Sequence, residues 1–230
     1  MRRKLSLSDW LISLSVIYVV VSVTMNIFCM KSLSFGTGII ICDGGTIISW
    51  MVFLISNVIV EVWDEEKSLR IVYLAAIVTF ITMIIGRIIV EIPTLPEYEY
   101  QNEAFRQIFS NGPRTIFASI TAFALGNFIN IHIIAVLKKR IEERMKDNRF
   151  LFFFRASSST LIGQLADNAL FLILAFAPIG ISVYEMAWQD IMTAVVSGTV
   201  IELLIESCFV PFITIPLTGM LNRIKEKEER

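Results

Sequence analysis

The chain has 230 residues, of which 55% are hydrophobic and 18% charged, and its mean hydropathy is +0.69. These values are typical of an integral membrane protein with one domain over residues 1–230. The net charge of −1 gives no indication of a nucleic-acid partner, and three scattered cysteines without C-x-x-C spacing argue against a metal site or a disulfide framework.

Six apolar segments predict an all-α polytopic membrane protein with a six-helix bundle. Each segment has the roughly 20 residues that a span requires. Helices are expected because a spanning segment must satisfy its own backbone hydrogen bonds. The first segment exceeds the apolar region of a signal peptide and lacks a cleavage site, so we expect it to be retained. The predicted spans are 10–30, 39–62, 69–92, 113–137, 150–178 and 188–217.

Lysine and arginine residues concentrate in the segments that share one side of a six-span bundle. Fifteen of the twenty lie before the first span, between the second and third, between the fourth and fifth, or after the sixth. Cytoplasmic loops are enriched in these residues, so we expect both termini to be cytoplasmic.

Three connecting segments leave alternatives open. The glycine-rich segment 34–46 (SFGTGIIICDGGT) is compatible with a short re-entrant or hairpin element and equally with a plain loop. The acidic segment 91–112 is compatible with a lid or a short surface helix, but a solvated loop is the favoured interpretation. Segment 138–149 (KKRIEERMKDNR) is compatible with an extension of the fourth helix into the cytoplasm that has spaced charge pairs, and a solvated positive-inside anchor is the favoured interpretation of its charges.

The fifth span carries an unusual number of polar residues in its segment 155–171 (RASSSTLIGQLADNALF). A carboxylate at bilayer depth costs about 2.5–3.5 kcal/mol on insertion scales, so it normally faces a cavity or a partner. Polar side chains also hold helices together. We favour the wall of a substrate pocket, because an interface rarely needs a carboxylate and two carboxamides on one stripe. At helical spacing, one face holds Ser157, Thr160, Gln164, Asp167 and Asn168.

Other spans also carry polar residues, and each has a simple structural explanation. Glu61 is compatible with pairing to Arg70 or Lys67, and Glu202 with neutralising an arginine elsewhere in the bundle. For Arg87, His132 and Glu206 the structural explanation is favoured: a snorkelling arginine, a hydrogen-bonded core histidine and a packed carboxyl. Together, however, polar stripes on five helices imply a hydrophilic cavity. Their members include Ser15, Ser22, Asn26, Asn57, Ser119, Asn127, Asn130 and Thr199.

The sequence argues against an enzyme. Ser197 and His132 lack a G-x-S-x-G context and a third group that would orient a base. A single histidine cannot supply an H-E-x-x-H zinc site, and no Walker motif is present. We therefore expect no catalytic residues, no metal and no cofactor. The sequence also contains no ring-forming selectivity filter of the kind that would indicate a channel.

The polar residues resemble motifs of the queuosine precursor transporter family, also called the vitamin uptake transporter family. Segment 26–31 matches its N-x-x-x-x-K motif. Segment 57–64 matches D-x-x-x-E-x-Y-G imperfectly, with Asn57 and Asp64 in place of the aspartate and glycine. Asn127 and Asn130 replace a glutamine and an aspartate. The family's P-R and A-S pairs correspond to Pro113-Arg114 and Ala118-Ser119.

The closest match is the fifth-span motif R-x-x-x-S-x-x-x-x-Q-x-x-D-x-x-x-F, formed here by Arg155, Ser159, Gln164, Asp167 and Phe171. The resemblance implies a six-helix bacterial inner-membrane importer of 7-deazaguanine bases such as queuine or aminomethyl-deazaguanine. The substrate-binding residues that it implies are Asn26, Asn57, Glu61, Ser119, Asn127, Arg155, Gln164, Asp167 and Phe171.

A guanine-like base suits these side chains chemically. Asp167 or Glu61 would accept the adjacent N–H and amino groups of the base in a two-pronged hydrogen bond. Gln164 and Asn127 would meet its carbonyl and ring nitrogens. Stacking on the ring face is expected from Phe171, Trp63 or Phe123, and a cationic side arm would favour Glu202.

Three functions remain open at this stage. The chain is a solitary importer of a modified base or similar heterocycle, a substrate-binding subunit of an energy-coupling vitamin importer, or a structural membrane protein. The first helix lacks an Ala-x-x-x-Ala stripe for docking to a shared scaffold, so no ATPase partner is expected. The expected partners are a small-molecule solute and the lipid bilayer, with a homo-oligomer left open.

Overall fold

The computed structural model describes residues 5–34, 42–109, 113–142, 149–179 and 185–229. Over these ranges the chain is almost entirely helical. The helices are α1 (Leu7–Phe28), α2 (Thr46–Val62), α3 (Glu65–Val90), α4 (Glu99–Phe109), α5 (Pro113–Glu142), α6 (Arg149–Phe176), α7 (Trp188–Phe209) and α8 (Ile215–Glu228). Two-residue strands β1 (Ser32–Leu33) and β2 (Cys42–Asp43) pair antiparallel.

Five helical segments are long and apolar enough to cross a membrane: Leu7–Phe28, Glu65–Val90, Arg114–Arg140, Phe150–Phe176 and Trp188–Glu228. The predicted class, an all-α membrane protein, is therefore confirmed. α2 is an apolar helix of only 17 residues, which is about 26 Å at 1.5 Å per residue and shorter than a hydrocarbon core of about 30 Å. It begins at Thr46, later than expected, because Cys42–Asp43 form β2. A sixth full-length span stays a prediction.

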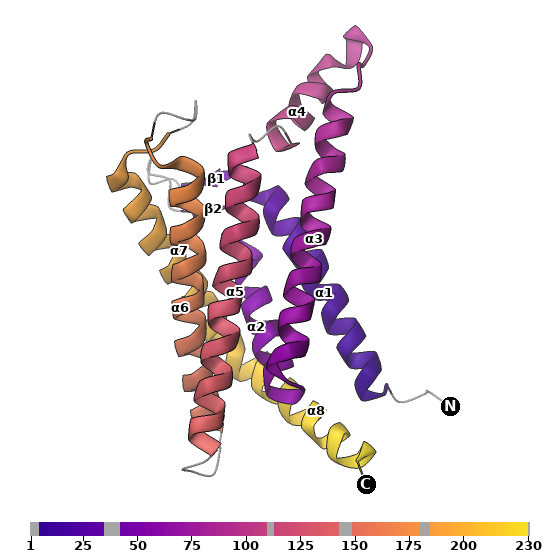
Figure 1. Ribbon diagram of the computed structural model, residues 1–230, viewed down its shortest axis with the longest axis vertical. Helices are drawn as coiled ribbons and strands as arrows, with labels where there is room; N and C mark the ends of the chain where they lie inside the picture. The colour runs from indigo at the N-terminus through magenta and orange to yellow at the C-terminus, as the bar shows by residue number, and fades with distance from the viewer. Residues whose placement is uncertain (1–4, 35–41, 110–112, 143–148, 180–184, 230) are drawn as a thin grey trace.

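α2 occupies the middle of the bundle (Figure 1). It contacts α1, α5 and α7, while α5 packs along α6, α6 along α7, and α1 along α3. Because α2 is surrounded by other helices, its side chains are apolar nearly all round and most of them are buried. α1 begins and α8 ends at one end of the bundle, and the β1–β2 hairpin lies at the other (Figure 1). The membrane side of each end remains a prediction.

The exposure pattern is inverted relative to a soluble protein. The outward face of α3 is apolar, with Ile77 and Ile88 each more than half exposed. Polar side chains such as Asn57, Asn130 and Gln164 are instead completely buried. Lipid offers no hydrogen bonds, so polar groups are satisfied inside the bundle and apolar ones face outward.

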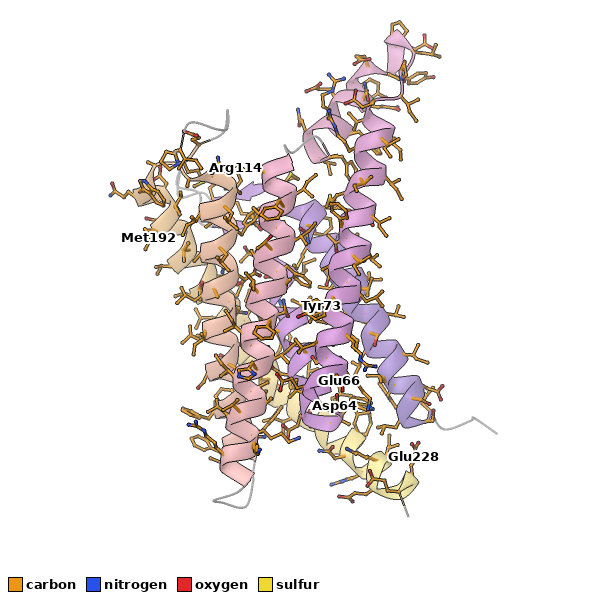
Figure 2. All side chains as sticks on the ribbon, viewed as in Figure 1. Asp64, Glu66, Tyr73, Arg114, Met192 and Glu228 are labelled. Atoms are coloured by element: carbon orange, nitrogen blue, oxygen red, sulfur yellow. The ribbon has the colours of Figure 1, made fainter. Side chains whose placement is uncertain are left out.

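Side-chain caps fix the helix ends. Ser6 and Asp9 form a capping box at the start of α1, and the Asp64 carboxylate accepts the Lys67 backbone N–H at 2.7 Å, which starts α3 two residues after α2 ends. At the opposite end of the bundle (Figure 2), Arg114 donates to the Leu174 and Ala177 carbonyl oxygens at 2.6 and 3.0 Å. These two hydrogen bonds satisfy backbone carbonyl oxygens that have no partner within α6 at its C-terminal end.

Segment 91–112 is not a plain solvated loop over its described part, and the favoured interpretation was wrong. A 3₁₀ turn (Pro96–Tyr98) leads into α4, which folds back onto α3 (Figure 1). Phe105 and Phe109 lie one helical turn apart with ring centroids at 5.7 Å, and the Phe109 ring lies directly on Gly86 of α3. The apolar spacing outweighs the acidic composition because it gives α4 an apolar face that packs partly against α3.

The glycine-rich segment 34–46 contributes the second strand of the short hairpin, in which Ser32 pairs with Asp43 and Leu33 with Cys42. Residues 35–41 lie outside the described ranges, so the choice between a re-entrant element and a loop there stays open. The hairpin leads directly into α2 and brings Asp43 close to the helix start.

The sixth predicted span is not one regular helix. A π-helical segment, Val210–Thr214, follows α7 and precedes α8. Pro211 lacks the N–H that an α-helix would need at this point, which accounts for the irregular turn. α8 then runs at an angle to α7 across the end of the bundle, where it contacts α1, α2 and α6 (Figure 1).

α5 and α6 cross with almost no separation at two glycines. A Cβ atom on Gly126 would lie 2.6 Å from the Asp167 Cβ and 3.0 Å from the Gly163 carbonyl oxygen. A Cβ on Gly163 would lie 2.7 Å from the Asn130 Cβ. Small residues permit this close approach between membrane helices, and here it sets the position of Asp167.

We expect Gly126→Ala to lower the free energy of unfolding by about 1–3 kcal/mol, because the added methyl group overpacks the crossing. Denaturant titration of the purified protein measures this. Gly219→Ala in α8 is the matched control, since a Cβ there meets nothing within 4 Å. Equal stability of the two variants would contradict the tight crossing.

Candidate substrate site

A cavity of about 60 Å³ lies between the hairpin and the middle of the bundle. We call it the hairpin cavity. Its walls come from α1, β2, α2, α5, α6 and α7, so it exists only when nearly the whole bundle is assembled. Ligand pockets commonly measure about 300–1,000 Å³, so the cavity is in a closed conformation here, and its walls must move apart to admit a solute.

Three carboxylates line the hairpin cavity: Asp43 from β2, Asp167 from α6 and Glu202 from α7. Glu202 accepts hydrogen bonds from the Ser49 hydroxyl and from the Asn168 amide at 3.0 Å. Asp167 makes no hydrogen bond to any residue that the structure describes. None of the described lining residues is a lysine, arginine or histidine. The cavity is therefore acidic and suits a solute that donates hydrogen bonds or carries positive charge.

Asp43 is held in place by the first turn of α2. Its Oδ1 atom accepts from the Thr46 backbone N–H at 3.0 Å and the Thr46 hydroxyl at 3.3 Å. Burial raises the pKa of Asp43, while the hydrogen bonds from Thr46 and Gly45 oppose that rise. Burial is the larger effect, so the folded protein binds a proton on Asp43 more readily than the unfolded chain does.

We expect Asp43→Asn to raise the melting temperature near pH 8 and to change it least in acid. A carboxyl whose pKa is raised by folding stabilises the protein below its ordinary range, and this stabilisation is lost as the pH rises through the folded pKa. Asparagine has no charge to desolvate, so the two melting curves should diverge with rising pH. Lower stability of Asp43→Asn at every pH would show that the Thr46 hydrogen bonds outweigh burial.

Amide and aromatic groups complete the cavity wall. The Asn26 amide donates to the Ser22 carbonyl oxygen at 2.8 Å and its oxygen accepts from the Ser119 hydroxyl, which orients it. Phe123 and Phe171 supply aromatic surface. An acidic cavity with oriented amides and aromatic rings can bind a flat heterocycle by hydrogen bonding at its edge and stacking on its face.

Beneath the cavity lies a layer of five buried polar residues, the central polar layer: Asn57, Asn130, Thr160, Gln164 and Glu206. Glu206 accepts from the Thr160 hydroxyl at 2.9 Å, the Gln164 amide at 3.4 Å and the Asn57 amide at 3.5 Å. Asn130 donates to the Asn57 oxygen at 3.0 Å. These bonds join α2, α5, α6 and α7 just below the cavity, although none of the five residues lines it.

Below this layer, Arg155 and Glu61 form an ion pair at 3.0 Å. Arg155 is completely buried, and its guanidinium lies 5.7 Å from the centre of the Phe152 ring. The Lys138 ammonium donates to the Glu61 backbone carbonyl at 2.7 Å. Glu61 and Phe152 also line a hollow of about 520 Å³ against α8, which we call the α8 groove. A polar column thus runs from the hairpin cavity toward the end where α8 lies.

The structure divides the sequence-predicted site residues among these levels. Asn26, Ser119, Asp167 and Phe171 line the hairpin cavity. Asn57 and Gln164 lie in the central polar layer, and Arg155 and Glu61 in the ion pair below. Asn127 lies outside the cavity lining, where it accepts from the Tyr18 hydroxyl at 2.9 Å. The predicted residues therefore fall on one path but not in one pocket.

Several structural explanations drawn from sequence differ from the observed contacts. Glu61 pairs with Arg155, whereas Arg70 pairs with Glu66 and Lys67 with Asp64. Glu202 is bound by Ser49 and Asn168 and not by an arginine. His132 is more than half exposed and bonds Glu65 at 3.1 Å, so it is not a core histidine. Linear spacing identifies a polar face but not the helix that covers it.

Asp43 was missed as a candidate. It precedes Gly-Gly-Thr at the start of an apolar run, and an aspartate three residues before a threonine N–H is a helix-start signal. That signal places Asp43 at a helix end without indicating that it faces a cavity. Trp63, proposed for stacking, lies outside the cavity lining, while Phe123 and Phe171 belong to it.

A family model described as "Putative vitamin uptake transporter" matches residues 43–215. The matched region includes all three cavity carboxylates and the whole central polar layer. No curated protein and no solved structure is similar enough to match. The match covers about three quarters of the chain and agrees with the apolar helices and the polar column. This multi-pass helical membrane protein belongs to the vitamin uptake transporter family.

Proposed function

We propose that this protein imports a queuosine precursor, a 7-deazaguanine base such as queuine or aminomethyl-deazaguanine, or a closely similar heterocycle. The family membership supports uptake of a small solute. The fifth-span motif, now seen as the polar face of α6, supports the deazaguanine class. The enrichment of basic residues at the end where the chain begins and ends supports entry from the hairpin side of a bacterial inner membrane.

The Asp167 carboxylate is the observation that carries this proposal. It faces the hairpin cavity without a hydrogen bond from any described residue, in a wall that also holds Phe123 and Phe171. A guanine-like edge presents two adjacent N–H donors, which match the two oxygens of one carboxylate. The base ring would then lie against the aromatic side chains, and an aminomethyl arm would reach toward Glu202 or Asp43.

A thermal-shift screen of the purified protein tests the proposal. The panel contains queuine, aminomethyl-deazaguanine, cyano-deazaguanine, guanine and common vitamins. A solute that binds only the folded state stabilises it by RT ln(1 + [L]/Kd), about 2.7 kcal/mol at one hundred times Kd. We expect saturable stabilisation by the deazaguanines. Stabilisation by a vitamin alone would reassign the solute, and no stabilisation by any compound would favour a structural role.

The solitary form of the importer rests on α1. Its exposed face carries Ile12, Val16 and Val20 in place of small residues, so it offers no close-packing stripe for a scaffold subunit. An ATPase that co-purifies with the protein in stoichiometric amount would instead make the chain the substrate-binding subunit of an energy-coupling importer.

A further inference from the structure

Glu206 is a buried carboxyl group without a described cationic partner at the narrowest part of the polar column. It is 1% exposed, and its three hydrogen-bond donors, Thr160, Gln164 and Asn57, are all neutral. Among the described charged residues, Glu202, one turn earlier on α7, acts electrostatically on Glu206. Arg155 on α6 and Lys138 on α5 both contact Glu61 on α2, and His132 on α5 contacts Glu65 on α3.

We propose that Glu206 binds a proton in this closed conformation and that this proton accompanies the solute inward. The inference rests on the proposed import function and supplies its driving force. Ionisable side chains inside a bundle, surrounded by other acids and not by bases, are typical of proton pathways in transporters. None of the five residues of the central polar layer lines the hairpin cavity or the α8 groove, so the layer leaves no room for a larger ion. A proton can bind there because it needs only an acceptor atom and no cavity.

The three hydrogen bonds donated to Glu206 favour its ionised form by themselves, whereas its burial and one unpartnered amide oxygen beside it favour the neutral form. Among the described atoms, the Gln164 Oε1 is buried and has no hydrogen-bond partner, although the Nε2 of the same amide lies 3.4 Å from the Glu206 Oε2. A half-turn of the Gln164 amide exchanges these two atoms. Oε1 would then accept the O–H of a protonated Glu206. An ionised Glu206 has no O–H to donate, so only the protonated form satisfies this oxygen.

The position of Glu206 links the proton to both hollows. Glu202, in the wall of the hairpin cavity, precedes it by one turn of α7, so the two carboxyl groups lie on the same face. The π-helical segment Val210–Thr214 begins four residues after Glu206, and the Val210 N–H bonds the Glu206 carbonyl oxygen. Irregular turns of this kind often lie at functional sites. When Glu206 loses its proton toward the α8 groove, repulsion from Glu202 and the missing O–H donor would loosen the central polar layer.

The first test needs no solute. Infrared spectroscopy of the purified protein at neutral pH should show the C=O stretching band of a protonated, buried carboxylic acid. Glu206→Gln should remove one component of that band, seen in the difference spectrum between wild type and variant, and Glu66→Gln, at an exposed site, should leave the band unchanged. Absence of the band in the wild-type protein, or an unchanged band in Glu206→Gln, overturns the proton site.

The second test measures coupling in proteoliposomes with aminomethyl-deazaguanine and a clamped membrane potential. With one proton per solute, a gradient of one pH unit drives about tenfold accumulation of the solute at equilibrium. We expect this accumulation in the wild-type protein and in Glu66→Gln, and no accumulation in Glu206→Gln although the solute still raises its melting temperature. Accumulation by Glu206→Gln equal to wild type overturns the coupling. Failure of the solute to stabilise any protein overturns the proposed function, while the infrared result still decides the proton site.

Discussion

Asp167→Asn is expected to weaken deazaguanine binding by roughly 100-fold while the protein stays folded. The carboxylate offers two acceptor oxygens to the base, whereas asparagine offers one oxygen and an NH₂ group that opposes the donors of the base. Hydrogen bonds to charged groups contribute about 1.5–3 kcal/mol each, so loss of one bond and mismatch of the other removes about 3 kcal/mol. The concentration dependence of the thermal shift measures the change in Kd.

Asp190→Asn is the matched control for this substitution. Asp190 lies exposed in the first turn of α7 and outside the hairpin cavity, so its replacement should leave solute binding unchanged. If Asp167→Asn and Asp190→Asn bound every deazaguanine as the wild type does, Asp167 would not hold the base. A loss of binding to aminomethyl-deazaguanine alone would place the Asp167 contact at the cationic arm and not at the base edge.

Glu61→Gln is expected to lower the free energy of unfolding by about 3–5 kcal/mol, because it leaves the completely buried Arg155 guanidinium without its carboxylate. Removing both charges, in Glu61→Gln with Arg155→Met, should recover a large part of that loss, since no uncompensated buried charge remains. Denaturant titrations of the single and double variants give the coupling between the two residues.

An exposed pair provides the comparison. Glu66 and Arg70 are both three-quarters exposed on α3, and Glu66→Gln should cost no more than about 1 kcal/mol. A double variant as unstable as Glu61→Gln alone would mean that Glu61 stabilises the bundle through contacts other than Arg155.

The sequence predicted those features that depend on one continuous segment, such as apolar length and helical spacing. Apolar length predicts membrane helices because lipid leaves the backbone no other partner, and the described helices follow the apolar segments closely. The polar face of α6 was visible at helical spacing because Thr160, Gln164 and Asn168 repeat every four residues. All three now bond residues of α7.

The spacing of polar residues along one helix did not predict which residues of other helices they bond. Glu61 was placed near Arg70 by proximity in the chain, yet it pairs with Arg155 from a helix 94 residues away. For Glu206 the sequence favoured a packed carboxyl on α7. Its three neutral hydrogen-bond donors come from α2 and α6, so only the packing of these helices against α7 identifies them. Segment 91–112 was judged by its acidic composition, whereas the contact between Phe109 and Gly86 shows what its helix covers.

The sequence by itself determined the membrane class, the approximate helix positions and the presence of a polar interior, because each follows from hydropathy and periodicity within single segments. Only the tertiary structure decided which polar groups share a cavity, which form the central polar layer and which pair below that layer. These depend on how closely the helices approach and at what height they cross. Gly126 and Gly163 bring α5 and α6 together at that crossing, and thereby place Asp167 in the wall of the cavity and Asn130 in the layer beneath it.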